Sequence, residues 1–427
     1  MENLNKIVYL PIEIKNREFY SKAILAAKLI QKNFKVVIGQ QWFIYDQILK
    51  NNFPPGIFFQ NSLNKIKYSQ LRAFKKKQFY NVLLDEENYS INFNHYDMMF
   101  LENISKSYFD DYIDKYYCNT VYELNAMKKN ITKNKEKFIL TGNVRKEFLE
   151  KYSGILDSEA EKLKLKYGKF ILINTNFGYI NSIFEDYLNK LLNDNVNNQK
   201  AILEIKNLFA FEEKNLQNLL IFLEIALKKF NNINFIIRPH PTENIEKVRE
   251  ISKNLLNYKN FIIDNSGSTH AFIKASLLLI HMSCTTGLEA VYLNKPAINF
   301  IPSYLKTFVE NILSFEVNKN VFSINDLVSQ VELFLSNKDY YKTEFKKESI
   351  PPSDIIAKDL ENSCIKWNEK FRIKLNNTYL NNPLKNLKIR TIYKEEVQNI
   401  INLVLKEKSL KKNYKIHELF DSAFLLY

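Results

Sequence analysis

The sequence is poor in the residues that mark several common classes of protein. It has three cysteines in 427 residues, Cys118, Cys284 and Cys364, and their spacing fits neither a disulfide framework nor a zinc site. No apolar run reaches the roughly 18 residues that a membrane-spanning helix needs. The N-terminus also lacks the charged and apolar segments of a signal peptide. We therefore expect a cytoplasmic protein in a reducing environment.

Glycine is also scarce, with eight residues in the whole chain. None of them forms a GxGxxG motif, so a dinucleotide-binding protein is not indicated. Four glycines follow predicted strands within a few residues, and we expect these positions to need backbone freedom. They are Gly39, Gly142, Gly178 and Gly287.

Positive charge and hydrophobic residues are abundant. The net charge is +14, and hydrophobic residues make up 46% of the chain, which is typical of a globular protein of two or three domains. The charge indicates an anionic partner, which is a phosphorylated substrate, a nucleic acid or an anionic membrane surface. The alternative is that the lysines are dispersed without function, as an AT-rich genome would produce.

Short apolar runs alternate with helical patterns along most of the chain, which predicts an α/β protein with doubly wound parallel sheets. A first series of strands, ending with 79–84, 97–101 and 137–140, predicts a Rossmann-like domain at residues 1–155. A second series starts at 169–173 and predicts another at residues 156–335. Residues 336–427 are mostly helical in pattern and are expected to form a C-terminal extension. We expect the strand-end loops of the two domains to face a shared cleft.

The stretch most typical of a ligand site covers residues 261–300. Its three apolar runs fit buried parallel strands, and the middle run is followed by SCTTG at 283–287 and then by a helical pattern. Ser283, Thr285 and Thr286 would point their hydroxyl groups at the same spot as the backbone amides of the helix start, which favours an anion. Gly287 would let a ligand approach the backbone closely.

A second motif predicts the same chemistry. The apolar run at 234–237 ends in RPHP, whose prolines prevent a helix and rigidify the loop. Arg238 and His240 therefore lie at the carboxyl end of a strand, where ligands bind in open α/β sheets. On a strand next to the SCTTG strand, they would clamp a phosphate. Asn176 and Gly178 follow the strand at 169–173 and are expected beside the same phosphate.

These motifs resemble those of a known group of enzymes. RPHP, SCTTGLEA at 283–290 and NKP at 294–296 are similar to motifs of bacterial surface-polysaccharide glycosyltransferases with the GT-B fold. Capsule and lipopolysaccharide β-Kdo transferases and bacterial sialyltransferases are the most similar groups. PIEIKNRE at 11–18 and LDEE at 84–87 look like the surface carbohydrate biosynthesis proteins. The resemblance covers about residues 7–302.

The resemblance implies that the C-terminal domain binds a nucleotide sugar and the N-terminal domain binds the acceptor. His240, Ser283, Thr285 and Thr286 would then contact the phosphate of a CMP-activated acidic sugar, Kdo or a nonulosonic acid. Glu289 matches a position that binds the ribose in GT-B enzymes. The implied acceptor is a glycan or a lipid-linked glycan.

The acidic triplet Asp85, Glu86 and Glu87 is expected to hold the catalytic base, because an inverting transferase needs a carboxylate to deprotonate the acceptor hydroxyl. Alternation along an extended strand favours Asp85 or Glu87. Glu13 and Arg17, in the first strand–helix loop, are expected to orient the acceptor or to contact the donor carboxylate. No DxD-like acidic pair stands beside the phosphate motifs, so we expect metal-independent catalysis with no cofactor besides the CMP-sugar.

Other interpretations stay open. The hydroxyl groups could cap a helix, Arg238 could form an ion pair, and the acidic triplet could be a solvated turn. A CDP-glycerol or ribitol-phosphate transferase can share both motifs, a UDP-sugar epimerase fits less well, and a non-catalytic scaffold of capsule assembly is a further alternative. No aromatic and basic RNA-binding motif is present. The lysine-rich tail at 385–412 permits peripheral contact with the inner membrane.

Overall fold

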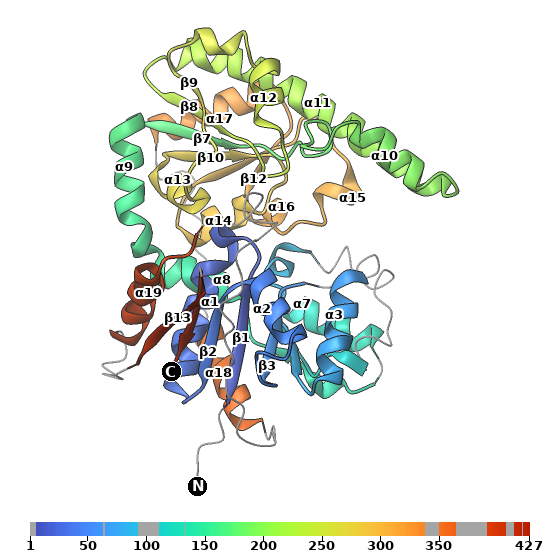
Figure 1. The fold of residues 1–427 in the computed structure, drawn as a ribbon. Helices are drawn as coiled ribbons and strands as arrows, with labels where there is room; N and C mark the ends of the chain where they lie inside the picture. The colour runs from blue at the N-terminus through green and yellow to red at the C-terminus, as the bar shows by residue number, and fades with distance from the viewer. Residues whose placement is uncertain are drawn as a thin grey trace. The chain divides into compact units, whose positions relative to one another are not determined.

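The computed structural model describes residues 6–62, 65–92, 111–131, 133–337, 350–363, 391–406, 414–420 and 422–427. These residues form two compact α/β units, each with a largely parallel sheet and helices packed against it (Figure 1). The second unit begins at Ser153 and contains residues 153–337 together with 90–92, and the remaining described residues belong to the first unit. The predicted fold class, with two Rossmann-like domains, is confirmed.

The described part of the first unit contains one eight-stranded sheet, in the order β13-β14-β2-β1-β3-β4-β5-β6. Its strands are β1 (Ile7–Ile12), β2 (Lys35–Gln40), β3 (Ile57–Gln60), β4 (Tyr80–Leu83), β5 (Lys115–Cys118), β6 (Phe138–Leu140), β13 (Ile416–Phe420) and β14 (Ala423–Leu426). Its helices are α1 (Lys15–Gln31), α2 (Gln41–Leu49), α3 (Lys65–Lys76), α7 (Val121–Asn130), α8 (Val144–Glu147), α18 (Pro352–Asn362) and α19 (Lys394–Lys406). Strands β1 to β6 run parallel, whereas β13 and β14 form an antiparallel hairpin beside β2.

The core of the first unit explains much of the aromatic content of the chain. The ring of Tyr9 on β1 stacks on Phe53 at 5.4 Å between centroids. The rings of Phe58 on β3 and Phe74 on α3 pack edge to face at 4.8 Å. Such pairs contribute about 0.5–1.5 kcal/mol beyond their buried area. Continuous apolar strands buried on both faces are typical of parallel sheets, so these runs identify the strands correctly.

Two features of the first unit differ from the sequence-based expectation. Helices α18 and α19 occur in the C-terminal region as expected, but this region packs within the first unit and adds the hairpin β13–β14 to its sheet. Strand β5, with the sequence KYYC, has no counterpart among the predicted strands. The strand predicted at 97–101 lies outside the described residues.

The second unit is built around the predicted stretch at 261–300. In the described residues its sheet has six strands, in the order β12-β11-β10-β7-β8-β9. They are β7 (Phe170–Asn174), β8 (Asn234–Arg238), β9 (Phe261–Ile263), β10 (Leu278–His281), β11 (Ala297–Phe300) and β12 (Lys319–Val321). The helices are α9 (Asp157–Tyr167), α10 (Tyr187–Asp194), α11 (Gln199–Lys229), α12 (Ile245–Ile251), α13 (Thr269–Ala275), α14 (Thr286–Tyr292), α15 (Lys306–Val309), α16 (Ser314–Val317) and α17 (Ile324–Ser336).

The strand order corrects one expectation about the phosphate motifs. The RPHP motif begins at Arg238, the last residue of β8, and the SCTTG motif follows β10. These strands are not neighbours, because β7 lies between them. Asn174, the last residue of β7, is in register with Arg238 on one side and with His281 on the other. The loop after β7 therefore connects the two motifs.

Candidate functional site

The loop after β10 is held in place by a buried histidine. Nδ1 of His281 accepts a hydrogen bond from the backbone N–H of Cys284 at 3.2 Å. Nε2 of His281 must then carry the proton, and it donates to Oδ1 of Asn318 at 2.9 Å. Burial lowers the pKa of His281 to about 4, so the imidazole is neutral at pH 7. His281 is therefore a structural residue that fixes the loop.

The lack of a side chain at Gly287 leaves space for the hydrogen bond between His281 and Asn318. A Cβ atom on Gly287 would lie 2.2 Å from both Nε2 of His281 and Oδ1 of Asn318, so no other residue fits without rearrangement. The side-chain amide of Asn318 also donates to the carbonyl of Gly287 at 3.2 Å. The expected reason for this glycine, close approach of a ligand, is replaced by close approach of the protein's own side chains.

The polar side chains at this edge of the sheet have unused hydrogen-bonding capacity. Both amide atoms of Asn174, the hydroxyl oxygen of Ser283 and the hydroxyl oxygen of Thr286 are buried and have no hydrogen-bond partner among the described residues. We call these three residues the Asn174 cluster. Thr285 precedes α14, but its side chain forms no capping hydrogen bond, so helix capping does not explain the hydroxyl groups.

The backbone of the loop after β10 is strained at Ser283. Ser283 adopts a left-handed conformation with φ of 44°, which is uncommon for a residue other than glycine. Its backbone N–H is held by Oδ1 of Asn299 at 2.8 Å, and its carbonyl accepts from the side-chain amide of Asn176 at 3.3 Å. Strained conformations of this kind persist where the surroundings fix them and are concentrated at functional sites.

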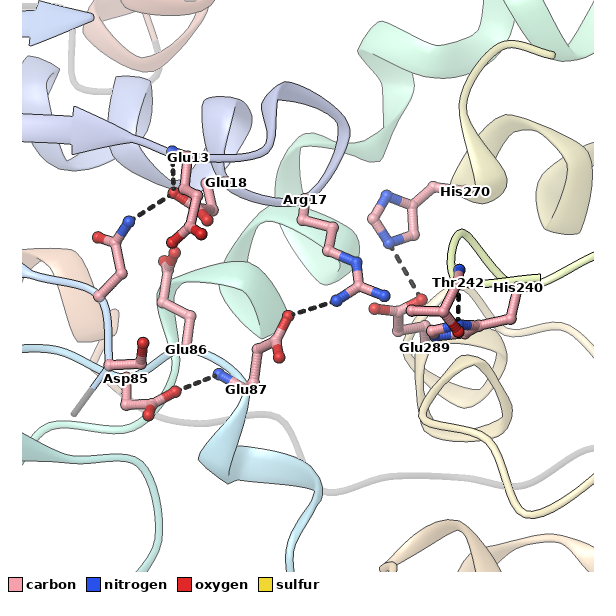
Figure 2. Close-up of polar contacts among 12 residues, drawn as sticks. Glu13, Arg17, Glu18, Asp85, Glu86, Glu87, His240, Thr242, His270 and Glu289 are labelled. Carbon is pink, nitrogen blue, oxygen red and sulfur yellow. Dashed lines mark hydrogen bonds and ion pairs between the residues drawn. The ribbon is translucent and has the colours of Figure 1, made fainter. Parts of the chain in front are cut away.

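The His240 loop lies against the loop that follows β7. Nδ1 of His240 is 2.7 Å from the hydroxyl oxygen of Thr242 (Figure 2). That hydroxyl lies where a Cβ atom on Gly178 would be, at 2.3 Å, so glycine is required for the two loops to meet. The predicted residues Asn176, Gly178, His240 and Ser283 are thus linked by contacts between successive loops.

Glu243 organises these loops and was not identified from the sequence. One of its carboxylate oxygens accepts hydrogen bonds from the hydroxyl of Thr175 at 2.6 Å and from the backbone N–H groups of His240 and Phe177 at 2.9 and 3.2 Å. The other oxygen accepts from the side-chain amide of Asn181 at 3.4 Å. Burial raises the pKa of Glu243, and these hydrogen bonds oppose that shift. In the sequence, its position three residues after His240 does not indicate that Glu243 holds these loops together.

Arg238 and Glu289 have partners within the second unit that their predicted roles did not include. The guanidinium of Arg238 donates to the carbonyls of Ser266 and Gly267 at 2.6 and 2.8 Å and lies over the ring of Phe272. Arg238 therefore holds the loop before α13. Oε2 of Glu289 is 3.2 Å from Nε2 of His270, and both side chains are buried (Figure 2).

The acidic triplet of the first unit follows β4 but does not continue its alternation, because the strand ends at Leu83. Burial, followed by the charge of Glu87, raises the pKa of Asp85 to about 8, so it is largely protonated at pH 7. Glu87 is exposed and pairs with Arg17 at 2.8 Å (Figure 2). Glu86 is buried, and neither of its carboxylate oxygens has a hydrogen-bond partner among the described residues.

Two charged residues of α1 join this site and were not identified from the sequence. Glu18 and Lys22 are four residues apart, so they lie on one face of the helix. Nζ of Lys22 is 3.9 Å from Oε2 of Glu86. Glu18 accepts from the backbone N–H of Glu13 at 2.9 Å, and burial raises the pKa of Glu18 to about 7. The carboxylate of Glu13 pairs with Lys67 at 3.0 Å.

No helix among the described residues has both the length and the apolar character that crossing a membrane requires. No group of three or more His, Cys, Asp or Glu side chains in the same residues is arranged to hold a metal ion.

Comparison with known proteins identifies the fold. No protein-family model matches the chain, and none of the curated proteins matches it. The structure of UDP-GlcNAc 2-epimerase from Methanocaldococcus jannaschii is similar, with a TM-score of 0.55 and 13% identity over 84% of this chain and 100% of that one. The chain has the GT-B fold.

Two further structures support this result. The M. jannaschii enzyme in complex with UDP-GlcNAc and UDP gives a TM-score of 0.54 at 13% identity, with the same coverage of both chains. UDP-GlcNAc 2-epimerase from Neisseria meningitidis bound to UDP-GlcNAc gives 0.51 at 14% identity, over 84% of this chain and 100% of that chain. At these identities the likeness is one of fold alone.

Proposed function

We propose that the chain is a nucleotide-sugar-dependent glycosyltransferase whose second unit binds the phosphate of the donor. The observation that carries this proposal is the Asn174 cluster, whose buried amide and hydroxyl atoms have no hydrogen-bond partner among the described residues. About 90% or more of buried polar groups in proteins are hydrogen-bonded. A ligand that accepts hydrogen bonds would satisfy the donors of the cluster, and phosphate oxygens do so.

The position of the cluster supports the same function. Asn174 ends β7, and Ser283 and Thr286 follow β10, so all three lie at the carboxyl edge of the parallel sheet. Ligands of open α/β sheets bind outside this edge. Helix α14 has only seven residues, so we assign the phosphate contacts to side chains and loop amides rather than to a helix dipole.

The resemblance of the RPHP and SCTTG motifs favours a CMP-activated acidic sugar, Kdo or a nonulosonic acid, as the donor. The acceptor would be a glycan or a lipid-linked glycan of a bacterial surface polysaccharide. His240 would contact the donor phosphate from the loop beside Gly178. On an acceptor in the inner membrane, the protein would act from the cytoplasmic side. It would attach peripherally to that membrane through its lysine-rich segments.

A second candidate function is UDP-sugar 2-epimerisation. It is favoured by the similarity in fold to the two UDP-GlcNAc 2-epimerases, which extends over 84% of this chain. The two candidates differ in the base of the nucleotide, so nucleotide preference separates them.

The test is the shift in thermal unfolding midpoint caused by CMP, CDP, UDP, GDP and UDP-GlcNAc. We expect CMP to stabilise the protein most. Thr286→Val should weaken CMP binding by roughly 10-fold or more, because a hydrogen bond to a charged group contributes about 1.5–3 kcal/mol. It should not lower the midpoint without nucleotide, because the hydroxyl has no hydrogen-bond partner to lose among the residues that the structure describes.

Thr307→Val, at an exposed position on α15 of the same unit, is the matched control and should leave CMP binding unchanged. Equal CMP affinity in the two variants, or no shift with any nucleotide, would contradict the phosphate site. A preference for CDP would favour a CDP-glycerol or ribitol donor. A preference for UDP-GlcNAc, with conversion of that sugar on incubation, would establish the epimerase instead.

A further inference from the structure

Two polar side chains are buried on the long helix α11, although a helix normally turns apolar residues toward a protein core. Eight residues of α11 are buried, and six of them are apolar. The two exceptions are Glu212 and Asn215, which are each 2% exposed. They are three positions apart and therefore lie on one face of the helix. Carboxyl and amide groups are costly to bury without hydrogen bonds, so their partners show what they do.

Glu212 holds the loop that follows β7. Its Oε2 atom accepts hydrogen bonds from the backbone N–H groups of Tyr179 and Ile180 at 3.0 and 3.1 Å. These residues come directly after Gly178, the glycine that lets this loop meet the His240 loop. Burial raises the pKa of Glu212 to about 8, although the two hydrogen bonds lower it. The carboxyl group is therefore mostly neutral at pH 7 and holds the loop in its protonated form.

Asn215 holds the segment that follows β11. Its Oδ1 atom accepts a hydrogen bond from the backbone N–H of Ser303 at 2.8 Å. About one helical turn earlier, Phe211 packs in an apolar cluster with Ile301 and Val309 of the same segment. This part of α11 thus contacts two loops of the carboxyl edge, which follow different strands of the sheet.

Both of these segments support Ser283, whose strained backbone carries one hydroxyl of the Asn174 cluster. Its backbone N–H donates to Oδ1 of Asn299 in β11 at 2.8 Å, and its carbonyl accepts from the side-chain amide of Asn176 at 3.3 Å. Asn176 precedes Tyr179 by three residues, and Asn299 precedes Ser303 by four. Each support of Ser283 therefore lies within four residues of a contact with α11.

The loop after β7 also connects this part of α11 to its outer end. Residues 199–210 of α11 contain no buried side chain, and α10 contains none either. Figure 1 shows α10 and the start of α11 at the outer end of the second unit, away from its sheet. The ring of Tyr179 lies 5.8 Å from that of Phe209 on α11 and 6.0 Å from that of Tyr187 on α10. Opening of the loop at Glu212 would therefore also change the exposure of α10.

We propose that Glu212 and Asn215 are positioning residues of the donor site, which hold the loops after β7 and β11 so that Ser283 keeps its strained conformation. This inference rests on the proposed phosphate site, and both residues act through the loops. The loop encloses Glu212 in its neutral form, so ionisation of this carboxyl group favours an open loop. Donor binding should then weaken as the pH rises.

The ionisable groups around Glu212 favour its neutral form. Glu243 faces it from the loop before α12, and the charge of Glu243 raises the pKa of Glu212 further. Tyr179 and Tyr187 are the ionisable residues of the adjoining loop and of α10, and Glu213 on α11 is exposed. No cationic side chain forms an ion pair with Glu212 in the part of the chain that the structure describes.

The first arm of the test is hydrogen-exchange mass spectrometry of the peptide covering residues 176–187, from pH 5 to pH 9. The closed loop binds the proton of Glu212 more tightly than an open loop, where the pKa would be near 4.5. The protection of this peptide in the wild type should therefore fall relative to Glu212→Gln as the pH rises, by roughly 10-fold or more, and level off above about pH 8.

Glutamine suits this comparison because it keeps an acceptor oxygen and does not ionise. Glu213→Gln, at the exposed neighbouring position of α11, is the matched control and should follow the wild type at every pH. Equal protection of the wild type and Glu212→Gln across this range would overturn the role of Glu212.

The second arm measures CMP affinity by calorimetry at pH 6 and pH 8.5. Glu212→Leu and Asn215→Leu should each weaken CMP binding by roughly 10-fold or more at pH 6, because the closed loops lose buried hydrogen bonds. Glu213→Leu should leave the affinity unchanged. Glu212→Gln should bind CMP like the wild type at pH 6 and more tightly than the wild type at pH 8.5. If a leucine variant does not fold, Glu212→Gln still decides the outcome through its pH dependence.

The outcomes separate this proposal from the proposed function. Leucine variants that lose stability but bind CMP normally would show that α11 has only a structural role, and would overturn the positioning roles alone. Absence of CMP binding by the wild type would overturn the phosphate site itself. Thr286→Val, which removes a direct contact, should weaken CMP binding equally at both pH values and leave the exchange of residues 176–187 unchanged. A pH-dependent effect of Thr286→Val that matches the effect of Glu212→Gln would contradict the separate role of Glu212.

Discussion

The carboxyl edges of the two sheets occupy equivalent places in their units but differ in chemistry. The edge of the first sheet has buried ionisable side chains, namely Glu18, Lys22, Asp85 and Glu86. At the second edge, the neutral amide and hydroxyl atoms of the Asn174 cluster have no hydrogen-bond partner among the described residues. The ionisable side chains buried there are engaged: Glu243 accepts hydrogen bonds from Thr175 and His240, and Glu289 lies 3.2 Å from His270. Arg238 donates to two backbone carbonyls, and His281 is neutral.

This difference suits two different tasks. A phosphate brings its own charge, so neutral donors bind it without a change in protonation near pH 7. Moving a proton requires an ionisable group, and Glu18 and Asp85, with pKa values raised to about 7 and about 8, show that the first edge changes charge in this range. The two edges would therefore respond differently to mutation and to pH.

The largest expected effect concerns the hydrogen-bonded carboxylate of the second edge. Glu243→Ala removes the acceptor of the N–H groups of His240 and Phe177 and of the hydroxyl of Thr175. Each buried donor left without a partner costs about 1–3 kcal/mol, so we expect a loss of about 3–5 kcal/mol in the free energy of unfolding. Urea denaturation measures this loss.

Glu246→Ala is the control for that measurement. Its carboxylate is exposed and pairs with Arg249 at 2.7 Å, so it should change stability by less than about 1 kcal/mol. Similar losses in the two variants would mean that the Glu243 hydrogen bonds do not hold the loops. The difference between the hydrogen-bonded Glu243 of the second edge and the Glu86 of the first edge would then have no consequence for stability.

The next effect concerns the pH dependence of the first edge. Folding raises the pKa of Glu18 from 4.5 to about 7, so the native state binds the proton more tightly than the unfolded state. The contribution of this group to stability is complete below about pH 4.5 and is lost as the pH rises through about 7. At about 1.4 kcal/mol per pKa unit, the loss is roughly 3 kcal/mol.

Glu18→Gln should abolish that loss, because glutamine keeps an acceptor oxygen and does not ionise. We expect the stability of the variant relative to the wild type to increase between pH 5 and pH 8, as measured by urea unfolding at each pH. Glu136→Gln, at an exposed site of the same unit, is the control and should show no such trend. A parallel course for Glu18→Gln and the wild type would contradict the raised pKa.

The smallest effect concerns the exposed member of the acidic triplet. Arg17 and Glu87 form an ion pair with partly exposed side chains, and such pairs contribute about 0–1 kcal/mol. Arg17→Gln should therefore change the unfolding free energy by less than about 1 kcal/mol, and less still at high salt. A larger loss at any salt concentration would mean that Glu87 contributes to the first edge as Glu86 does.

Much of the fold and part of the site could be predicted from the sequence. Continuous apolar runs identified β7, β8, β10 and β11, because parallel strands are buried on both faces. Prolines and hydroxyl residues located the loops of His240 and Ser283 at strand ends. Three of the four predicted glycines, Gly39, Gly178 and Gly287, proved to be required by close contacts, with Ala423, Thr242 and His281 respectively. The fourth, Gly142, has a positive φ of 81°.

Other features depend on contacts between distant parts of the chain. Ser353 satisfies Glu147 from 206 positions away, and no local pattern contains that information. Strand β14 pairs with β2, which lies almost 400 residues earlier in the sequence. The periodicity of a short segment therefore could not predict the hairpin. Glu243 and Lys22 look like ordinary surface residues of loops and helices until their surroundings are known.

The sequence by itself determined where strands end and which polar residues follow them, because backbone periodicity and turn chemistry are local. It did not determine which of Asp85, Glu86 and Glu87 has unused hydrogen-bonding capacity, nor that Arg238 would be engaged by the loop before α13. Those outcomes depend on which donors and acceptors the folded chain brings within about 3 Å of each side chain. Only the tertiary structure decides that, because burial removes the water that would otherwise satisfy every polar group equally.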